Sequence, residues 1–232
     1  LPVQSFSIIL LLLFLLLRFL LVMNKFLVLF KRNLLSILEK FAQNSCNIIA
    51  CTRKIDKDFS KKCDLIKKKY SIDLHNFCFD LENEKEVISV ANEINSKFSN
   101  IDILINNAGT NLTSLIQMTK LSDMHKIFQI NFFSVFAFTQ VILKNMMKNK
   151  NGTIVNISSS AASNNPIGRS IYSASKSSLE KFSKTISKEY SVFNIRSNVI
   201  APGLVDTKMM KTSTNEKNLQ EFIKNLPSKR IG

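Results

Sequence analysis

Short apolar runs alternate with longer amphipathic stretches from about residue 35 onward. Each short run has the length and composition of one buried strand. These predicted strands are residues 47–51, 75–79, 101–105, 153–157 and 197–201. The stretches between them carry apolar residues three and four positions apart, as in Val87, Val90, Ala91 and Ile94, which predicts helices. The predicted helices are residues 36–44, 57–69, 82–98, 122–148 and 174–193.

This regular alternation predicts the fold class. Strand–helix–strand order is typical of an α/β protein with a doubly wound parallel sheet of the Rossmann-like type. In such a sheet, ligands bind where the strands reach their carboxyl ends. The chain has 232 residues and no internal repeat or flexible linker, so we expect residues 31–232 to form a single domain.

The N-terminal segment, residues 1–30, differs from the rest of the chain. From Phe6 to Val22, 15 of 17 residues are apolar, and Lys31 and Arg32 follow a second apolar run. One interpretation is a membrane anchor with a cytoplasmic domain behind it. The other is translated sequence that is not native protein, because the first methionine is Met23. A cleaved signal peptide is disfavoured, since no basic residues precede the run.

Charge and cysteine content restrict the kinds of partner and site. Lys and Arg outnumber Asp and Glu by 32 to 17, which would attract phosphates, acidic carriers or anionic lipids. The lysines are scattered, however, and no basic helix carries interleaved aromatic residues, so we expect no nucleic-acid partner. The four cysteines form no CxxC pair and have no histidine cluster beside them. We therefore expect neither disulfides nor a metal site, and a cytoplasmic location unless the anchor is real.

Four groups of small polar residues lie at or near the ends of the predicted strands. They are Asn106–Gly109, Ser158–Ser160, Tyr172–Lys176 and Pro202–Thr207. Asn106 comes 66 residues before Tyr172, Ser159 comes 13 before it, and Pro202 comes 30 after it. In order and spacing the four groups together resemble the short-chain dehydrogenase/reductase family, from about Ser36 to the end of the chain.

The chemistry of Tyr172 and Lys176 explains their spacing. Residues four apart project from one face of a helix, so the ammonium can lie beside the phenol. A free phenol has a pKa of about 10, and a neighbouring positive charge favours the phenolate. Tyrosine then becomes usable as a proton donor and acceptor near neutral pH.

The resemblance implies roles for two more catalytic residues. Ser159 would bond the substrate carbonyl or hydroxyl and position it for hydride transfer. Asn131 matches the family's fourth catalytic position, where it would hold a water in a proton relay toward the lysine. A helix-surface amide is the alternative interpretation of Asn131.

The resemblance also implies a nicotinamide cofactor. Asp80 and Leu81 would contact adenine, and Asp80 could instead, or in addition, cap a helix beginning near Glu82. Arg53 occupies the position where an arginine accommodates the 2′-phosphate, which favours NADP over NAD. The remaining predicted contacts are Asn107, Ala108 and Gly109 under the adenine ribose, and Pro202, Gly203, Val205 and Thr207 beside the nicotinamide. Tyr172 and Lys176 are expected to bind the cofactor as well as to act in catalysis. Residues 208–226 would form a lid over the substrate.

The sequence departs from the family at the glycine-rich turn TGxxxGIG after the first strand, which binds the pyrophosphate. That turn should fall near residues 27–34, which contain no glycine. We hypothesise a local frameshift, because the codons of Ser-Lys-Gly-Ile read one base early spell Phe-Lys-Arg-Asn, the residues at 30–33. A coding DNA in which no one-base shift restores TGxxxGIG would exclude it. Relatives also continue with another helix and strand, so we expect an incomplete sheet and marginal stability.

The function implied is that of an NADP-dependent oxidoreductase, most similar to 3-oxoacyl-carrier-protein reductases. Its substrate would be a small carbonyl compound or an acyl thioester carried by an acidic carrier protein, and the family forms homotetramers. Two alternatives stay open. One is a catalytically inactive fragment or pseudogene product, and the other is a membrane-anchored reductase.

Overall fold

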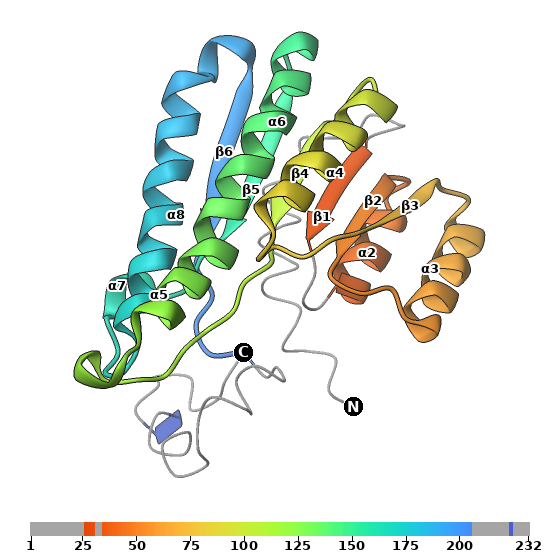
Figure 1. Cartoon of the computed structure of the whole chain (residues 1–232). Helices are drawn as coiled ribbons and strands as arrows, with labels where there is room; N and C mark the ends of the chain where they lie inside the picture. Colours follow the sequence, from red (N-terminus) through yellow and green to blue (C-terminus); the bar gives the residue numbers. More distant parts are fainter. Residues whose placement is uncertain (1–25, 31–33, 206–222, 225–232) are drawn as a thin grey trace.

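The computed structural model describes residues 26–30, 34–205 and 223–224. Six parallel strands form one sheet in the order β3-β2-β1-β4-β5-β6 (Figure 1). The strands are β1 (Phe26–Phe30), β2 (Asn47–Thr52), β3 (Leu74–Cys78), β4 (Ile103–Asn106), β5 (Gly152–Ile157) and β6 (Ile195–Ile200). The chain runs outward from β1 to β3 and then crosses back to β4. This confirms the doubly wound parallel sheet.

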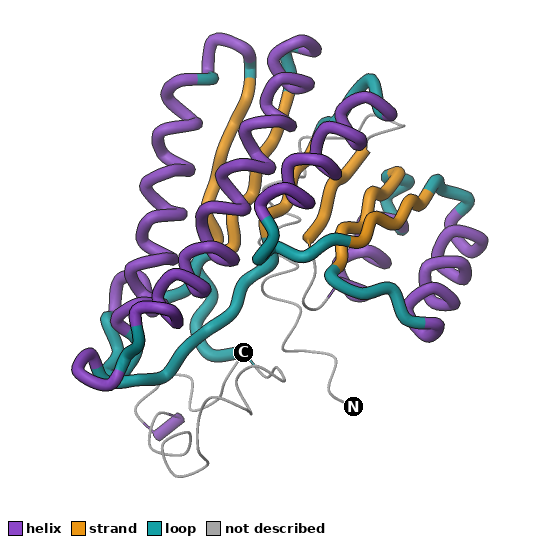
Figure 2. Tube along the Cα trace, viewed as in Figure 1, coloured by secondary structure: helices purple, strands orange, loops and turns teal. Residues whose placement is uncertain are grey.

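Helices connect the strands and cover the sheet (Figure 2). The α-helices are α2 (Leu34–Ala42), α3 (Lys57–Tyr70), α4 (Glu84–Lys97), α5 (Leu121–Phe128), α6 (Ser134–Asn149), α7 (Ala161–Asn164) and α8 (Ser170–Glu189). Two short 3₁₀ turns, η1 (Ile116–Met118) and η3 (Ser191–Phe193), and the π-helical turn η2 (Gln129–Phe133) complete the described part.

The core has two layers, one on each face of the sheet, because successive strand residues point to opposite faces. Ile49 and Leu104 pack with α4, α6 and α8 on one face. Ile48 and Ile105 pack with α2 and α3 on the other. Strands buried on both faces explain the continuous apolar runs in the sequence.

Strand β1 changes the boundary of the domain. It lies in the middle of the sheet and pairs with both β2 and β4. The domain therefore starts at Phe26 at the latest, within the segment 1–30 that the sequence analysis set apart. The stretch from Phe6 to Val22 and Met23 lie outside the described residues. Of the turn expected at residues 27–34, residues 27–30 are strand, residue 34 begins α2, and residues 31–33 are not described.

Within the described residues, one helical segment has the length and apolar character needed to cross a membrane. This segment, Leu121–Asn149, runs through α5, η2 and α6, and half of its most apolar window is buried inside the protein. Its apolar residues include Phe138 and Ile142, which belong to the core over the sheet. The segment is therefore a core helix of this fold.

Several predicted boundaries differ from the structure near the site. The predicted helix 82–98 begins at Glu84, and its N-cap is Asn83, whose side chain accepts a hydrogen bond from the Glu86 N–H. The alternative in which Asp80 caps this helix is therefore wrong. The last predicted helix begins four residues early, at Ser170, so that Tyr172 lies in its first turn.

Candidate active site

The predicted site residues gather where the strands reach their carboxyl ends, which we call the carboxyl edge of the sheet. The chain reverses its direction across the sheet between β1 and β4, the position where such folds bind ligands. The loops leaving this edge carry Arg53 after β2, Asp80 and Leu81 after β3, Asn107, Ala108 and Gly109 after β4, Ser159 after β5, and Pro202, Gly203 and Val205 after β6.

Asn131 is buried at the centre of the π-helical turn η2 and is not a helix-surface amide. Its Oδ1 accepts a hydrogen bond from the Thr110 N–H at 2.8 Å, and its Nδ2 donates to the Thr110 carbonyl at 2.9 Å. The same Nδ2 donates to Ser175 Oγ at 3.0 Å. Asn131 thus joins the loop after β4 to helix α8, so its side chain is fixed from both sides.

Lys176 is also buried, with 4% of its surface exposed. Its Nζ donates a hydrogen bond to the carbonyl oxygen of Ile157, the last residue of β5, at 2.7 Å. Burial lowers the pKa of Lys176 to about 8, because an ammonium loses hydration in the interior. A lysine with this pKa exists in both protonation states near neutral pH, which is typical of catalytic groups.

Gly109 lies against this pair. A Cβ atom at position 109 would lie 3.2 Å from Lys176 Nζ and 3.4 Å from Asn131 Oδ1. The resemblance assigns the lack of a Cβ here to the adenine ribose. The structure gives a second reason for glycine at this position: a side chain at 109 would crowd the buried Lys176 and Asn131 side chains.

The loop after β5 is tied to α8 and to the loop after β6. The Ser159 hydroxyl is partly exposed and accepts a hydrogen bond from the Ala161 N–H at 3.2 Å. The Ser160 N–H donates to the Pro202 carbonyl at 2.8 Å, which holds the Pro202 loop beside the serine. Ser158 donates to Glu180 Oε1 of α8 at 2.7 Å. These contacts fix where Ser159 lies relative to α8.

Tyr172 and Lys176 lie one turn apart in α8, as the spacing predicts. Two residues that the sequence analysis missed adjoin them. Ser175 Oγ donates to the Tyr172 carbonyl at 2.8 Å while accepting from Asn131. Arg169 precedes the helix. Burial lowers its pKa, and a charge interaction with Tyr172 partly opposes that shift. Neither residue stands out in the pattern YxxxK.

A cavity of about 480 Å³ also lies at the carboxyl edge, where β2, β3 and β4 end. Its walls include Arg53, Asp80, Leu81, Ala108 and Gly109, five of the predicted cofactor contacts. This volume and these walls suit the adenosine half of a dinucleotide. The structure therefore brings five of the six predicted adenosine contacts together in one cavity, and Asn107 is not among the residues that line it.

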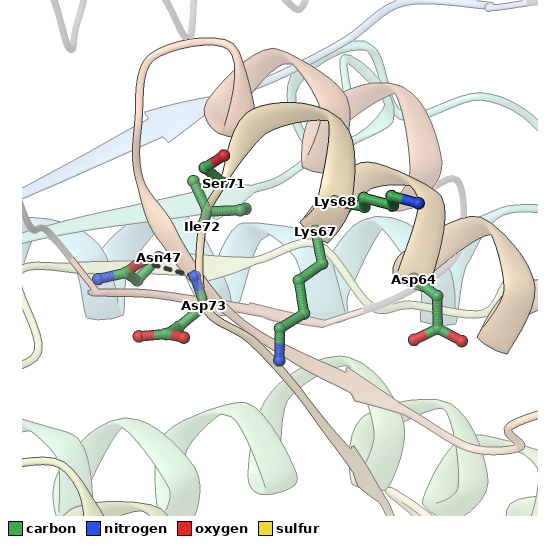
Figure 3. Close-up of a pocket in the computed structure, with 7 residues that line it drawn as sticks. All are labelled: Asn47, Asp64, Lys67, Lys68, Ser71, Ile72 and Asp73. Atoms are coloured by element: carbon green, nitrogen blue, oxygen red, sulfur yellow. Dashed lines mark hydrogen bonds between the residues drawn. The ribbon is translucent and has the colours of Figure 1, made fainter.

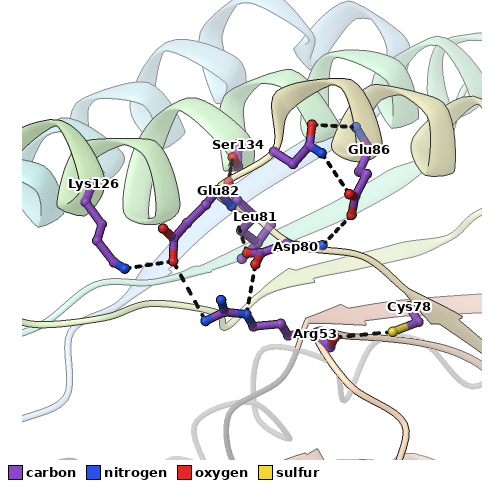
Figure 4. A network of polar contacts seen from close by, with 9 residues as sticks. Arg53, Cys78, Asp80, Leu81, Glu82, Glu86, Lys126 and Ser134 are labelled. Atoms are coloured by element: carbon purple, nitrogen blue, oxygen red, sulfur yellow. Dashed lines mark hydrogen bonds and ion pairs between the residues drawn. The ribbon is translucent and has the colours of Figure 1, made fainter.

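Ion pairs line this cavity (Figure 4). Arg53 Nε lies 2.9 Å from Asp80 Oδ2, and Arg53 Nη1 lies 3.7 Å from Glu82 Oε1. Lys126 Nζ of α5 lies 3.0 Å from the same Glu82 oxygen. Glu82 and Lys126 lie 44 residues apart and meet only in the folded chain, so no sequence pattern marks them as site residues.

A larger hollow, of about 540 Å³, lies at the opposite edge of the sheet (Figure 3). Its walls come from Asn47 at the start of β2, from α3, and from the turn before β3. Asn47 Oδ1 accepts a hydrogen bond from the Asp73 N–H at 2.9 Å. None of the predicted site residues lines it, so it belongs to a different part of the surface.

Two predictions on the C-terminal part cannot be placed. Thr207 lies outside the described residues, and so does the expected lid at 208–226 except for residues 223–224. Within the described part of the chain, no three His, Cys, Asp or Glu residues are grouped as a metal site. No disulfide joins any of the four cysteines, all of which lie in the described part of the chain.

The chain resembles known proteins in sequence. The family model for short chain dehydrogenases matches residues 35–218. A 3-oxoacyl-[acyl-carrier-protein] reductase of Buchnera aphidicola is 33% identical over 172 residues, which are 74% of this chain and 70% of that protein. Carbonyl reductase family member 4 of Xenopus laevis is 37% identical over 153 residues, 66% of this chain and 63% of that protein. The chain thus spans roughly two thirds of these relatives.

Solved structures resemble it in fold. A putative short-chain alcohol dehydrogenase from Sinorhizobium meliloti superposes with a TM-score of 0.82 at 22% identity, covering 91% of this chain and 84% of that one. An NAD⁺-bound xylitol dehydrogenase superposes with a TM-score of 0.77 at 22% identity, covering 90% and 86%. At this level of identity the likeness supports the fold alone.

Proposed function

Because this chain belongs to the short-chain dehydrogenase/reductase family, whose members are oxidoreductases, we propose that it reduces the ketone of a 3-oxoacyl thioester with NADPH. The observation that carries the proposal is the buried cluster of Asn131, Lys176 and Gly109 beside the first turn of α8. Burying an amine and an amide is costly unless each is hydrogen-bonded. A lysine buried at position 176 does not help the fold, which points to a role in chemistry.

The described residues fit a nicotinamide cofactor on the adenosine side. The cavity of about 480 Å³ has an arginine and an aspartate where the family resemblance expects them. The Lys176 amine and the Pro202 loop lie at the adjoining strand ends, where the nicotinamide end of the cofactor would lie. When bound, the nicotinamide supplies the hydride. The residues 31–33, where the pyrophosphate turn would fall, are not described.

The protein's own side chains would handle the proton and the carbonyl. The Ser159 hydroxyl donates a hydrogen bond to the substrate oxygen and holds the ketone in place. The Tyr172 phenol would donate its proton to that oxygen, which becomes the hydroxyl of the product alcohol. Below pH 8, Lys176 is mostly ammonium and stabilises the negative charge that develops on Tyr172. Asn131 holds the loop after β4 against α8 through its hydrogen bonds to Thr110 and Ser175.

The choice of substrate and cofactor rests on the relatives and on Arg53. Several similar proteins are named 3-oxoacyl-[acyl-carrier-protein] reductases. Arg53, with 70% of its side chain exposed at the cavity, can receive a 2′-phosphate. The excess of 15 positive charges would favour an acidic carrier protein.

A direct assay tests the proposal. Purified chain, NADPH and an acetoacetyl thioester are combined, and NADPH consumption is followed by its absorbance. We expect turnover that falls by about a thousandfold in Tyr172→Phe, because the proton donor is lost. The proposal fails if neither acetoacetyl thioesters nor simple ketones are reduced while NADPH binds. It also fails if Tyr172→Phe is as active as the wild type.

A further inference from the structure

Glu82 lies where two cations meet at the wall of the adenosine cavity (Figure 4). Its Oε1 is 3.0 Å from Lys126 Nζ and 3.7 Å from Arg53 Nη1. Asp80 holds the Nε side of the same guanidinium at 2.9 Å. A carboxylate between an arginine and a lysine has the contacts that a phosphate oxygen would have in the same position.

The charges of the cavity wall cancel. Its described basic residues are Arg53, Lys54 and Lys126, and its described acidic residues are Asp56, Asp80 and Glu82. Three positive and three negative charges sum to zero. A phosphate ester carries a charge of about −1.5 to −2 near pH 7, so this wall offers it two well-placed cations but no net attraction.

We propose that the Glu82 carboxylate occupies the anion position between Arg53 and Lys126, and that Lys126 is a second cation for the 2′-phosphate. This inference rests on the proposed use of NADP. A bound 2′-phosphate takes the two cations from Glu82, which turns outward.

Because these side chains are exposed, replacing the Glu82 carboxylate by a phosphate should require little free energy. The side chains of Glu82, Arg53 and Lys126 are 32%, 70% and 54% exposed. Ion pairs this exposed contribute little to stability, and their side chains can reorient in solvent. Glu82 therefore competes with the phosphate and narrows the preference for NADP over NAD.

Two fragments that differ only in the 2′-phosphate test the proposal on the full chain. Adenosine 2′,5′-bisphosphate and adenosine 5′-monophosphate are titrated by calorimetry, so no catalytic turnover is needed. Glu82→Gln removes one negative charge from the anion position. We expect it to bind the bisphosphate about fivefold more tightly, with less than a twofold change for the monophosphate. Lys126→Gln should weaken the bisphosphate about threefold.

The matched control is Glu84→Gln, which changes the net charge equally two residues away. Glu84 is exposed, lies outside the cavity wall and takes part in none of the ion pairs among the described residues. Equal behaviour of Glu82→Gln and Glu84→Gln would overturn the role of Glu82. An unchanged bisphosphate affinity in Lys126→Gln would overturn that of Lys126. If the wild type and Glu82→Gln bind neither fragment, the NADP site itself is wrong and this inference with it.

Discussion

The two sides of the carboxyl edge differ in how their polar side chains are held: by buried hydrogen bonds on one side and by exposed ion pairs on the other. On the catalytic side, Asn131, Ser175 and Lys176 are buried; Asn131 donates a hydrogen bond to Ser175, and Lys176 donates one to the backbone carbonyl of Ile157. On the adenosine side, Arg53 and Glu82 make exposed ion pairs. Buried polar groups are costly to disturb, whereas exposed ion pairs contribute little to folding. Changes on the catalytic side should therefore affect both folding and chemistry, and changes on the adenosine side should affect ligand preference much more than folding.

Lys176→Met should have the largest effect. Activity should fall about a thousandfold, because the ammonium one helical turn from Tyr172 is lost. Stability at pH 7 should rise, since moving the pKa from 10.5 to about 8 means that the buried charge costs about 3 kcal/mol. Denaturant unfolding at pH 7 measures this. A large loss of stability in Lys176→Met would contradict the account.

The pH dependence of the stability gained in Lys176→Met tests whether the buried charge causes it. The pKa of Lys176 is lower in the folded state than in the unfolded state, so between pH 8 and 10.5 the unfolded chain binds more protons. The wild type therefore recovers stability as the pH rises through this window. The advantage of Lys176→Met should shrink toward zero by about pH 10. A difference that stays constant from pH 7 to pH 10 would show that the cost is not one of charge.

Asn131→Ala should be the next largest change. It removes a fully buried amide and leaves the Thr110 N–H and carbonyl without these partners, which should cost about 2–4 kcal/mol. The control is Asn149→Ala in α6, an exposed amide that also hydrogen-bonds to backbone and should cost less than about 1 kcal/mol. Equal losses in the two variants, measured by urea unfolding, would remove the distinction between buried and exposed amides.

A smaller effect is expected from glycine to alanine changes at the same edge. In Gly109→Ala the added Cβ must push Lys176 Nζ, at 3.2 Å, which should cost about 1–2 kcal/mol. In Gly203→Ala the Cβ meets no atom within 4 Å among the described residues, so the melting temperature should hardly change. Two variants with the same melting temperature would mean that position 109 is not tightly packed.

The smallest effect is expected on the adenosine side. Asp80→Asn breaks the ion pair with Arg53 and should lower stability by less than about 1 kcal/mol. The loss should vanish in 1 M salt, where screening removes most of the exposed pair. A loss of several kcal/mol that persists in high salt would show that this side is as rigid as the catalytic side.

Local patterns in the sequence account for most of the fold and for the choice of candidate catalytic residues. Period and spacing are local properties, so the runs around Ile49 and Ile154 and the pair Tyr172 and Lys176 could be predicted. Strand β1 was missed as a separate element because its apolar residues continue the N-terminal hydrophobic segment. The π-helical turn at Asn131 has no sequence signal beyond the helix around it.

Contacts between distant segments were beyond sequence reasoning. Glu82 and Lys126 look like solvated charges until the loop after β3 meets α5. In the sequence, Ser175 is an ordinary residue between Tyr172 and Lys176. In the structure, it accepts a hydrogen bond from Asn131 of η2. In both places the chemistry depends on which segments the sheet order brings together, and a single sequence does not reveal that order.

We expect the catalytic side to be preformed for a nicotinamide, although the sequence near residues 27–34 departs from the family's glycine-rich turn. The most direct measurement is titration of the chain with NADPH while the emission of the reduced nicotinamide is recorded. We expect a saturable enhancement of this emission that weakens strongly in Lys176→Met but only slightly in Glu84→Gln. A wild-type chain that gives no saturable change at millimolar NADPH would contradict it.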